Sequence, residues 1–303
     1  MKKRRIGNSD LYVSELGLGC MSIGTEEKTA RKIIEASLEE GINYFDTADL
    51  YDFGENEKIV GNALKDVREK VIIASKVGNR WSQDKKGWSW DPSKSYIKEE
   101  VKQSLKRLGT DYIDLYQLHG GTLNDPIDET IEAFEELKAE GYIRYYGISS
   151  IRPNVIREYV KKSSIVSVMM QYSILDRRPE EEVLPFLQEH GISVVTRGPL
   201  AKGLLSDQML NKVSEKGYQD YSLNQLSEVL PLLKERVAPS RPFTEVALQY
   251  NLANPAVASV VTGASSLEQV KCNAKAVRSQ PLSDEEVSII KELTKANTYK
   301  DHR

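Results

Sequence analysis

Four residues with acid–base side chains stand at the ends of predicted strands, or shortly after one, within the first 120 positions of the chain. Asp46, Lys76 and His119 each stand where a short apolar segment ends, and Tyr51 follows Asp46 by five residues. A phenol is a poor acid at neutral pH because its ordinary pKa is about 10. A nearby ammonium favours the phenolate, and a carboxylate beside the lysine keeps that ammonium charged. With histidine orienting a carbonyl oxygen, this set could polarise and protonate a carbonyl.

Each of these residue types also has an ordinary structural explanation. An aspartate at a strand end usually caps a helix, a lysine is usually solvated, and most of the 15 tyrosines are expected to pack. A histidine at the end of a buried strand is often hydrogen-bonded within the core. The prediction therefore depends on the whole set at consecutive strand ends. The set lacks a hydride, which no side chain supplies and a nicotinamide must.

Short apolar segments alternate with longer amphipathic ones along the chain. Helices are predicted where apolar residues follow three-to-four spacing, as from Ile97 to Leu108 and from Ile131 to Leu137. Such alternation requires a parallel sheet, and eight units predict a (β/α)8 TIM barrel, in which the strand ends meet at one face. The predicted strands are Leu16–Gly19, Tyr44–Asp46, Val71–Ser75, Ile113–His119, Tyr145–Ser149, Val166–Gln171, Ser193–Arg197 and Val260–Thr262.

The remaining segments fit around such a barrel. An N-terminal β-hairpin of Arg4–Ile6 and Leu11–Val13 could cover its bottom. An insertion of about Ser206 to Arg241 precedes a helix at Phe243–Asn254, and an extra C-terminal helix is predicted from Ser283 to Ala296. Since no linker or shift in composition interrupts the chain, we expect residues 1–303 to form a single domain.

The composition excludes several classes of protein. The 303 residues carry 42 Lys and Arg against 45 Asp and Glu, a net charge of −3, which argues against a nucleic-acid partner. Apolar runs of about four residues are far shorter than the ~18 that a membrane helix needs. The two cysteines, Cys20 and Cys272, give neither a disulfide framework nor a metal-ligand spacing, so no metal is expected. We expect a cytoplasmic protein, either a monomer or a small homo-oligomer.

Over essentially its whole length the chain resembles the aldo-keto reductases. The similarity is greatest to the bacterial general-stress and inositol-linked reductases, and the potassium-channel β subunits are more distant. The resemblance implies a (β/α)8 barrel, NADPH (with NADH possible) bound without a Rossmann domain, and reversible reduction of small aldehydes and ketones. The segments that carry it are Gly17–Gly19, Gly41–Ala48, Tyr51 with Gly54–Glu57, Ser75–Lys76, Asp111–His119, Ile143–Ser149, Gln171–Ser173 and Gly263–Gln269.

The resemblance also implies a role for each residue of the acid–base set. Tyr51 corresponds to the general acid, Lys76 and Asp46 to the pair that lowers its pKa, and His119 to the group that orients the substrate. All three tryptophans lie between Gly78 and Pro92, where aromatic side chains could form substrate walls or simply anchor the loop. The residues expected at the substrate are Met21, Tyr51, Trp81, Trp88 and His119.

The cofactor contacts are implied by the same resemblance. They are Cys20, Met21, Asp46, Ser149, Ser150, Gln171, Arg197, Gly198, Pro199, Leu200, Ala201, Lys202, Gly203, Gly263, Ser265, Gln269, Cys272 and Asn273. Relatives commonly carry an aromatic residue at the position of Arg197. A guanidinium can also stack on nicotinamide, and a strand-end salt bridge is the alternative. Hydroxyls at Ser265 and Ser266, where relatives often carry a cation, predict only a moderate preference for NADPH.

Two other functions are compatible with parts of this pattern. A redox-sensing regulatory subunit would bind NADPH and turn over slowly, as the channel β subunits do by resemblance. A barrel enzyme acting on phosphosugars or glycosides would need paired carboxylates at strand ends, and only Asp46 is so placed.

Overall fold

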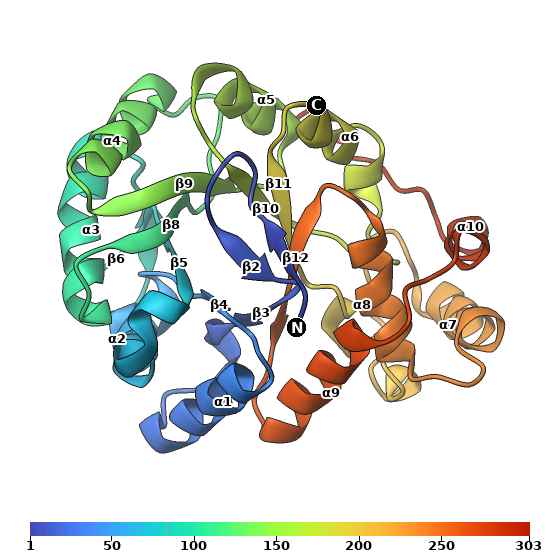
Figure 1. Ribbon diagram of the computed structural model, residues 1–303. Coiled ribbons are helices and arrows are strands. Elements are labelled where there is room, and N and C mark those ends of the chain that lie inside the picture. The colour runs from blue at the N-terminus through green and yellow to red at the C-terminus, as the bar shows by residue number, and fades with distance from the viewer. Residues whose placement is uncertain (83) are drawn as a thin grey trace.

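The computed structural model describes residues 1–82 and 84–303, and a closed barrel of parallel strands forms its centre (Figure 1). The barrel follows chain order and closes where β12 pairs with β3, with Val260 opposite Leu16. This arrangement confirms the predicted (β/α)8 fold. Within the described residues its strands are β3 (Leu16–Gly19), β4 (Tyr44–Asp46), β5 (Ile72–Val77), β8 (Ile113–Leu118), β9 (Ile143–Ser149), β10 (Ser167–Gln171), β11 (Ser193–Arg197) and β12 (Val257–Gly263).

The barrel strands are buried on both faces, because successive side chains point alternately into the barrel and toward the helices. Tyr44, Ala74, Leu115, Met169 and Val195 belong to a compact inner cluster. A larger outer cluster lies between the strands and the surrounding helices. Apolar residues on both faces explain why the strands appear in the sequence as continuous apolar runs.

Helices surround the barrel (Figure 1). Ser93 caps α3 by accepting a hydrogen bond from the backbone N–H of Tyr96, and Gly109, with φ +61°, ends it. The helices are α1 (Glu27–Glu39), α2 (Glu55–Leu64), α3 (Lys94–Leu108), α4 (Ile127–Ala139), α5 (Pro153–Lys162), α6 (Val183–Glu189), α7 (Leu223–Val237), α8 (Phe243–Ala253), α9 (Leu267–Arg278) and α10 (Asp284–Leu293). Short 3-10 turns are η1 (Cys20–Ser22), η2 (Tyr51–Gly54), η3 (Lys65–Lys70), η4 (Arg178–Glu180), η5 (Ala201–Gly203) and η6 (Met209–Asn211).

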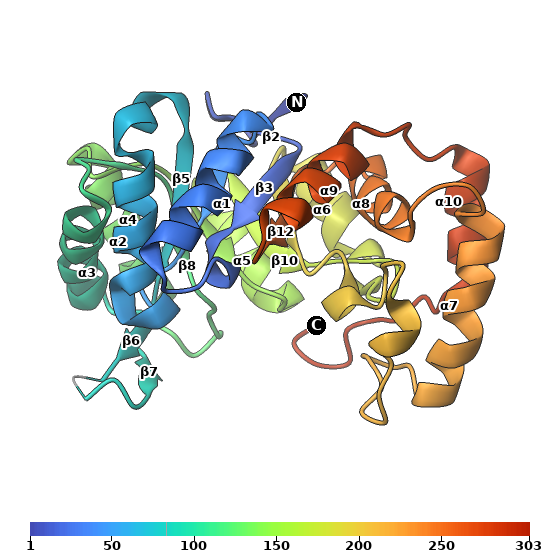
Figure 2. The same cartoon turned by 90° about the horizontal axis from the view of Figure 1, so that it is seen from below.

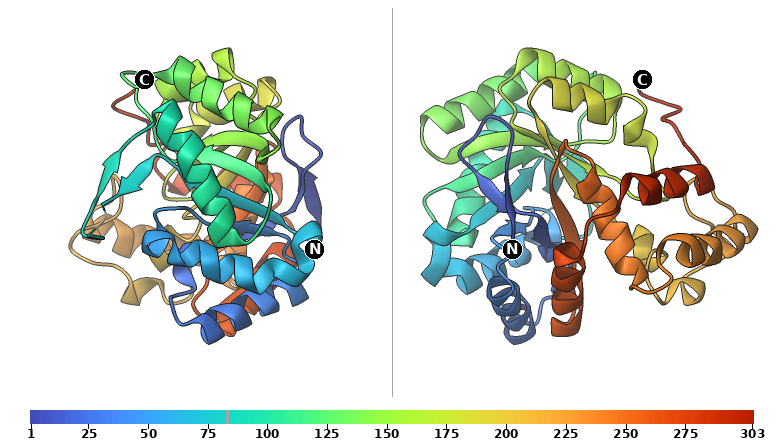
Figure 3. Two further views of the ribbon diagram at one scale, coloured as in Figure 1. Left: turned by 90° about the vertical axis from the view of Figure 1, so that its left-hand side faces the viewer. Right: turned by 45° about the vertical axis from the view of Figure 1, so that its right-hand side comes forward.

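Two helices lie outside the regular alternation. The predicted insertion contains α7, and the predicted C-terminal helix is α10, which begins with a capping box between Ser283 and Glu286. These two helices lie beside each other at one side of the barrel (Figure 3, right). No helix among residues 1–82 and 84–303 is long and apolar enough to span a membrane.

A β-hairpin lies at each end of the barrel (Figure 2; Figure 3, left). The N-terminal hairpin pairs β1 (Lys3–Arg5) with β2 (Tyr12–Ser14), one residue away from the predicted bounds. The shift arises because Ile6 and Leu11 belong to the turn, where they join the inner cluster and close the bottom of the barrel.

The second hairpin lies at the opposite end, in a segment for which the sequence predicts only a loop. It pairs β6 (Asn79–Trp81) with β7 (Trp88–Trp90). Trp81 lies opposite Trp88, a cross-strand aromatic pair of the kind that stabilises antiparallel strands.

Candidate functional site

The ends of β4 and β5 place a buried ion pair at the mouth of the barrel. The Lys76 Nζ donates to Asp46 Oδ2 at 2.7 Å and to the backbone oxygen of Thr47 at 2.8 Å. Lys76 is 1% exposed and Asp46 is 4% exposed. Burial raises the pKa of Asp46, and attraction to Lys76 only partly offsets this rise. Burial alone would lower the pKa of Lys76, but Asp46 and the Tyr51 oxygen outweigh burial and raise it, so the ammonium stays charged.

The same ammonium donates its third hydrogen bond to the Tyr51 hydroxyl oxygen. Nζ lies 3.1 Å from the phenol oxygen and 4.8 Å from the centre of the ring. The backbone after Tyr51 is left-handed at Asp52 (φ 49°) and Phe53 (φ 54°), before Gly54 (φ 84°). Such strain is costly for residues other than glycine and is typical of functional sites. This turn keeps the phenol directed back toward Lys76 before α2 begins.

His119 completes the set as the first residue beyond β8. Its ring stands nearly perpendicular to that of Tyr51, at 83°, with the ring centres 5.9 Å apart. Burial, and then the charges of Lys76 and Arg197, lower the pKa of His119 to about 3. Its Nδ1 is buried and has no hydrogen-bond partner among the described residues. A neutral imidazole facing a phenol is suited to hold a carbonyl oxygen between them.

The other half of the barrel rim presents polar groups of a different kind. Ser149, Gln171, Arg197 and Gly263 end four consecutive strands, β9 to β12. The Gln171 Nε2 donates to Asp176 Oδ2 at 2.8 Å, while its Oε1 accepts from Arg197 Nη1 at 3.0 Å. The Gln171 amide is therefore held at both ends.

Two backbone features on this half suit the phosphates of a dinucleotide. From Gly198 to Gly203 the backbone is left-handed at four positions, a kind of turn that can form an anion-binding concavity. The N–H groups of Ala201 and Gly203 donate to Gly198 and Leu200 within the segment, so an anion would bind to the other N–H groups there. Helix α9 follows β12, is capped by Ser266, and points its N-terminus toward the rim. At Gly263 an added Cβ would lie 2.3 Å from Ser22 Oγ, so β12 and η1 approach closely there. The residues present therefore fit an extended dinucleotide.

Several residues predicted to contact the cofactor have other partners. Asn273 is buried and donates from Nδ2 to Thr262 Oγ1 at 3.1 Å. The Gln269 Oε1 accepts from the backbone N–H of Ser265 at 2.8 Å. Cys20 is buried near Asp46, where burial raises the pKa of its thiol, whereas the Cys272 side chain is exposed.

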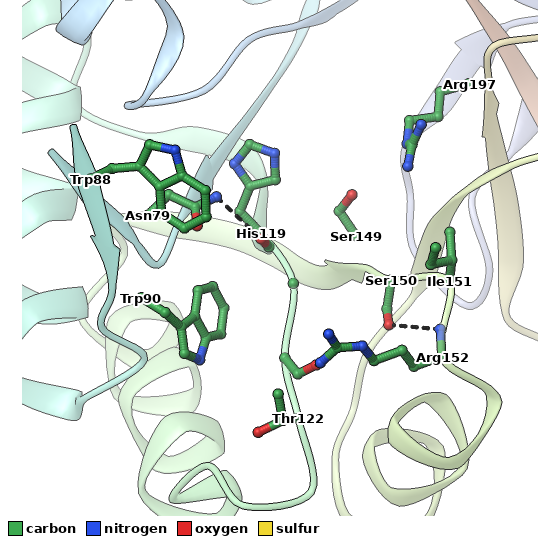
Figure 4. Close-up of a pocket in the computed structure, with 12 residues that line it drawn as sticks. Asn79, Trp88, Trp90, His119, Thr122, Ser149, Ser150, Ile151, Arg152 and Arg197 are labelled. Carbon is green, nitrogen blue, oxygen red and sulfur yellow. Dashed lines mark hydrogen bonds between the residues drawn. The ribbon is translucent and has the colours of Figure 1, made fainter. Parts of the chain in front are cut away.

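A pocket of about 470 Å³ opens beside His119 (Figure 4). Of the residues predicted at the substrate, Trp88 and His119 line it, whereas Tyr51, Trp81 and Met21 are not among the lining residues. The Tyr51 ring lies next to that of His119, and the Trp81 ring packs against Phe53 with the ring centres 6.0 Å apart. Met21 has 64% of its surface exposed. The lining residues are Asn79, Trp88, Trp90, His119, Gly120, Gly121, Thr122, Ser149, Ser150, Ile151, Arg152 and Arg197.

Comparison with known proteins assigns the chain to a family. A model of the aldo/keto reductase family matches residues 15–295. The chain belongs to that family. An uncharacterized oxidoreductase, YqkF, of Bacillus subtilis (strain 168) is 60% identical over the full length of both chains. The NADH-specific methylglyoxal reductase of Escherichia coli (strain K12) is 33% identical over 98% of this chain and 99% of its own.

A solved structure agrees with this assignment. The holo form of the aldo-keto reductase AKR11C1 from Bacillus halodurans superposes with a TM-score of 0.95 at 63% identity, covering 100% of this chain and 99% of that one. This aldo/keto reductase is therefore an NAD(P)H-dependent oxidoreductase that acts on small carbonyl compounds.

The structure of this reductase also brings residues to the site that the sequence did not single out. Gln117 lies opposite Lys76 on β8 and is fully buried, and neither atom of its amide has a hydrogen-bond partner among the described residues. Its place two residues before His119 puts both on one face of the strand, a spacing that could have identified it. Asp176 holds Gln171 and pairs with Arg178 at 2.7 Å, but it lies in a turn with no periodic signal.

Proposed function

We propose that this aldo/keto reductase reduces aldehydes and ketones to alcohols with NADPH as the preferred donor, NADH also being accepted. The observation that carries the proposal is the buried chain of contacts from Asp46 through Lys76 to the Tyr51 oxygen, at 2.7 and 3.1 Å. These contacts direct the Tyr51 hydroxyl so that it can donate a proton at the barrel mouth. The residues proposed to bind the cofactor lie at the same mouth.

In the proposed reaction, the substrate carbonyl oxygen binds between Tyr51 and His119. His119 is neutral and donates a hydrogen bond that orients the oxygen, and Tyr51 transfers its proton to it. The Lys76 ammonium stabilises the negative charge left on the phenol oxygen. When bound, the nicotinamide supplies the hydride that reduces the carbonyl carbon.

The residues proposed to hold the cofactor lie at η1, at the ends of β4 and of β9 to β12, in the segment Gly198–Gly203 and on α9. We propose that Ser149 and Gln171 bind the nicotinamide carboxamide together with Ser150. Gln171 Oε1 accepts one hydrogen bond from Arg197 and has a second lone pair, which we propose accepts the N–H of the carboxamide. The Arg197 guanidinium, held next to this site, is proposed to stack on the nicotinamide ring. Residues Gly198–Gly203 and the N-terminus of α9 are proposed to bind the phosphates.

The cofactor preference rests on the adenosine end. Ser265 and Ser266 offer hydroxyls at the start of α9, and α9 brings a dipole that favours a 2′-phosphate. A relative named for NADH specificity belongs to the same family, so both cofactors are part of the test. Fluorescence titration with NADPH and NADH measures the two dissociation constants directly. A tighter constant for NADH contradicts the proposed preference.

The variant Tyr51→Phe tests the acid assignment. Without the hydroxyl, kcat for a panel of aldehydes should fall about 10²- to 10⁴-fold, the usual contribution of a positioned acid. The dissociation constant for NADPH should change by less than about twofold, because the ring remains. The control Tyr12→Phe removes a hydroxyl from the exposed hairpin at the opposite end of the barrel.

Three results are informative. Comparable kcat in Tyr51→Phe and in the wild type contradicts the proposal. Repeated turnover in the wild type supports an enzyme. A single stoichiometric oxidation of NADPH would instead indicate the redox-sensing function.

A further inference from the structure

The pocket beside His119 is lined by two arginines. Two guanidinium groups, those of Arg152 and Arg197, line it together with His119. Among the described residues, no aspartate or glutamate forms part of this lining. The chain as a whole carries a net charge of −3, so the pocket differs in sign from the protein around it.

Arg152 is held in the pocket wall by neutral groups. Its backbone N–H donates to Ser150 Oγ at 3.2 Å, and its Nη1 donates to the backbone oxygen of Gly121 at 2.5 Å. Within residues 1–82 and 84–303 it forms no ion pair, whereas Arg178 pairs with Asp176. A guanidinium has five N–H donors in a rigid fork that matches a carboxylate. One side-chain donor is bound to Gly121, and the other guanidinium donors have no hydrogen-bond partner among the described residues.

One acidic residue, Asp125, lies next to the pocket wall. It accepts from Trp90 Nε1 at 3.0 Å and from the Thr122 backbone N–H at 2.7 Å, and among the described residues it forms no ion pair with Arg152. The Trp90 ring packs closely on Gly78 and Gly120, which fixes its position. Trp88, 58% exposed, extends the aromatic wall. In Figure 4 the Arg152 side chain reaches across to the segment that leads from His119 to Thr122.

We propose that the carbonyl substrate of this reductase carries a carboxylate, which Arg152 binds while Trp88 and Trp90 cover the body of the substrate. The inference rests on the proposed function, in which Arg197 serves the cofactor and His119 the carbonyl oxygen. Arg152 then determines specificity: it contacts the substrate at a distance from the reacting atoms and favours oxo acids over neutral aldehydes of the same size.

A pair of aldehydes that differ only in charge tests this inference. 4-Carboxybenzaldehyde and its methyl ester are compared in steady-state reduction at saturating NADPH by the wild type and by Arg152→Gln, Arg152→Lys and Arg157→Gln. Arg157→Gln is the matched control, since it removes one positive charge from α5 at a residue that pairs with Glu182. The difference in carbonyl reactivity between acid and ester is the same in every variant and cancels in the ratio.

The expected result is selective. In Arg152→Gln, kcat/KM for the acid should fall about 10- to 100-fold, mainly through KM, as expected for loss of a charge-assisted hydrogen bond. The value for the ester should stay within about threefold, Arg152→Lys should be intermediate, and Arg157→Gln should match the wild type. In the wild type, raising KCl should lower the acid-to-ester ratio, because salt screens the attraction.

Other outcomes overturn the inference. If kcat/KM falls equally for acid and ester in Arg152→Gln, the role of Arg152 is only to hold the backbone at Gly121. If the affinity for NADPH falls as well, Arg152 contributes to cofactor binding and not to substrate binding. An acid-to-ester ratio that is independent of both KCl and Arg152 would also refute it, and the KCl measurement needs no variant to fold. If the wild type reduces the ester but not the acid, this inference is refuted while the proposed function still stands. If neither aldehyde is reduced with NADPH or NADH, the proposed function fails.

Discussion

Replacing Lys76 by methionine removes one charge from the centre of the proposed mechanism and leaves an unbranched side chain that is one atom shorter. In the wild type, Nζ contacts Asp46 Oδ2, the Thr47 carbonyl and the Tyr51 oxygen within 3.1 Å. The variant therefore has two separable effects. It withdraws the cation from the phenol, and it leaves the Asp46 carboxylate buried without its partner.

The catalytic effect follows from the distance between Nζ and the phenol oxygen. At 3.1 Å and an effective dielectric constant of about 20, a full negative charge on that oxygen interacts with the ammonium by about 5 kcal/mol. If roughly half of this charge has formed in the transition state, about 2.7 kcal/mol is lost, and kcat falls about 100-fold. The effect on stability is of similar size, because removing one partner of a buried ion pair costs about 3–5 kcal/mol.

The double variant Asp46→Asn/Lys76→Met separates the two effects. It removes both charges, so urea unfolding should show much of the lost stability restored, while kcat stays low. The assay is steady-state reduction of an aldehyde by Lys76→Met, Asp46→Asn and the double variant, with NADPH affinity measured by fluorescence. A Lys76→Met protein that retains kcat within about threefold refutes the reasoning. So does a double variant that recovers kcat together with stability.

Two further predictions concern stability. Since the pKa of His119 in the folded protein is about 3, against about 6.5 unfolded, the unfolded chain binds more protons between these values, and stability falls as the pH falls through this window. His119→Asn should reduce the slope of unfolding free energy against pH by up to about 1.4 kcal/mol per pH unit, measured by urea unfolding from pH 4 to 6; an unchanged slope contradicts this. Gly61→Ala places a Cβ 2.2 Å from the Leu108 oxygen and should cost about 1–3 kcal/mol, whereas Gly87→Ala, with nothing within 4 Å, is its control. Equal unfolding midpoints for the two glycine variants would show that α2 and α3 can separate freely.

Local periodicity predicted the barrel strands correctly, with errors of one or two residues at the strand ends that carry the site. The sequence predicts that the third strand ends at Ser75 and the fourth at His119. In the structure Lys76 lies within β5 and His119 just beyond β8. A strand ends where its pairing with the neighbouring strand ends, and here Lys76 still pairs with Gln117. Local hydrophobicity does not specify this pairing. The errors leave both side chains at the barrel mouth, because alternation along each strand still directs them inward.

The tryptophan hairpin shows a larger limit of the sequence pattern. The segment around Lys85 and Gly87 lacks the alternating apolar pattern of a strand pair. Trp88 and Trp90 line the pocket, while Trp81 turns to Phe53. The choice among three equivalent residues is made by contacts with η2, far from them in the sequence.

The sequence by itself determined the alternation of strands and helices and the residue types at the strand ends, since both follow from patterns within a few residues. The strand ends predicted in this way place Asp46, Lys76 and His119 at the same end of the barrel. Only the tertiary structure decided which groups share a pocket and which already have partners. The contacts of Arg152 with Gly121 and of Gln171 with Arg197 join residues about 30 positions apart. They exist because strand order and twist bring separate loops together at the rim.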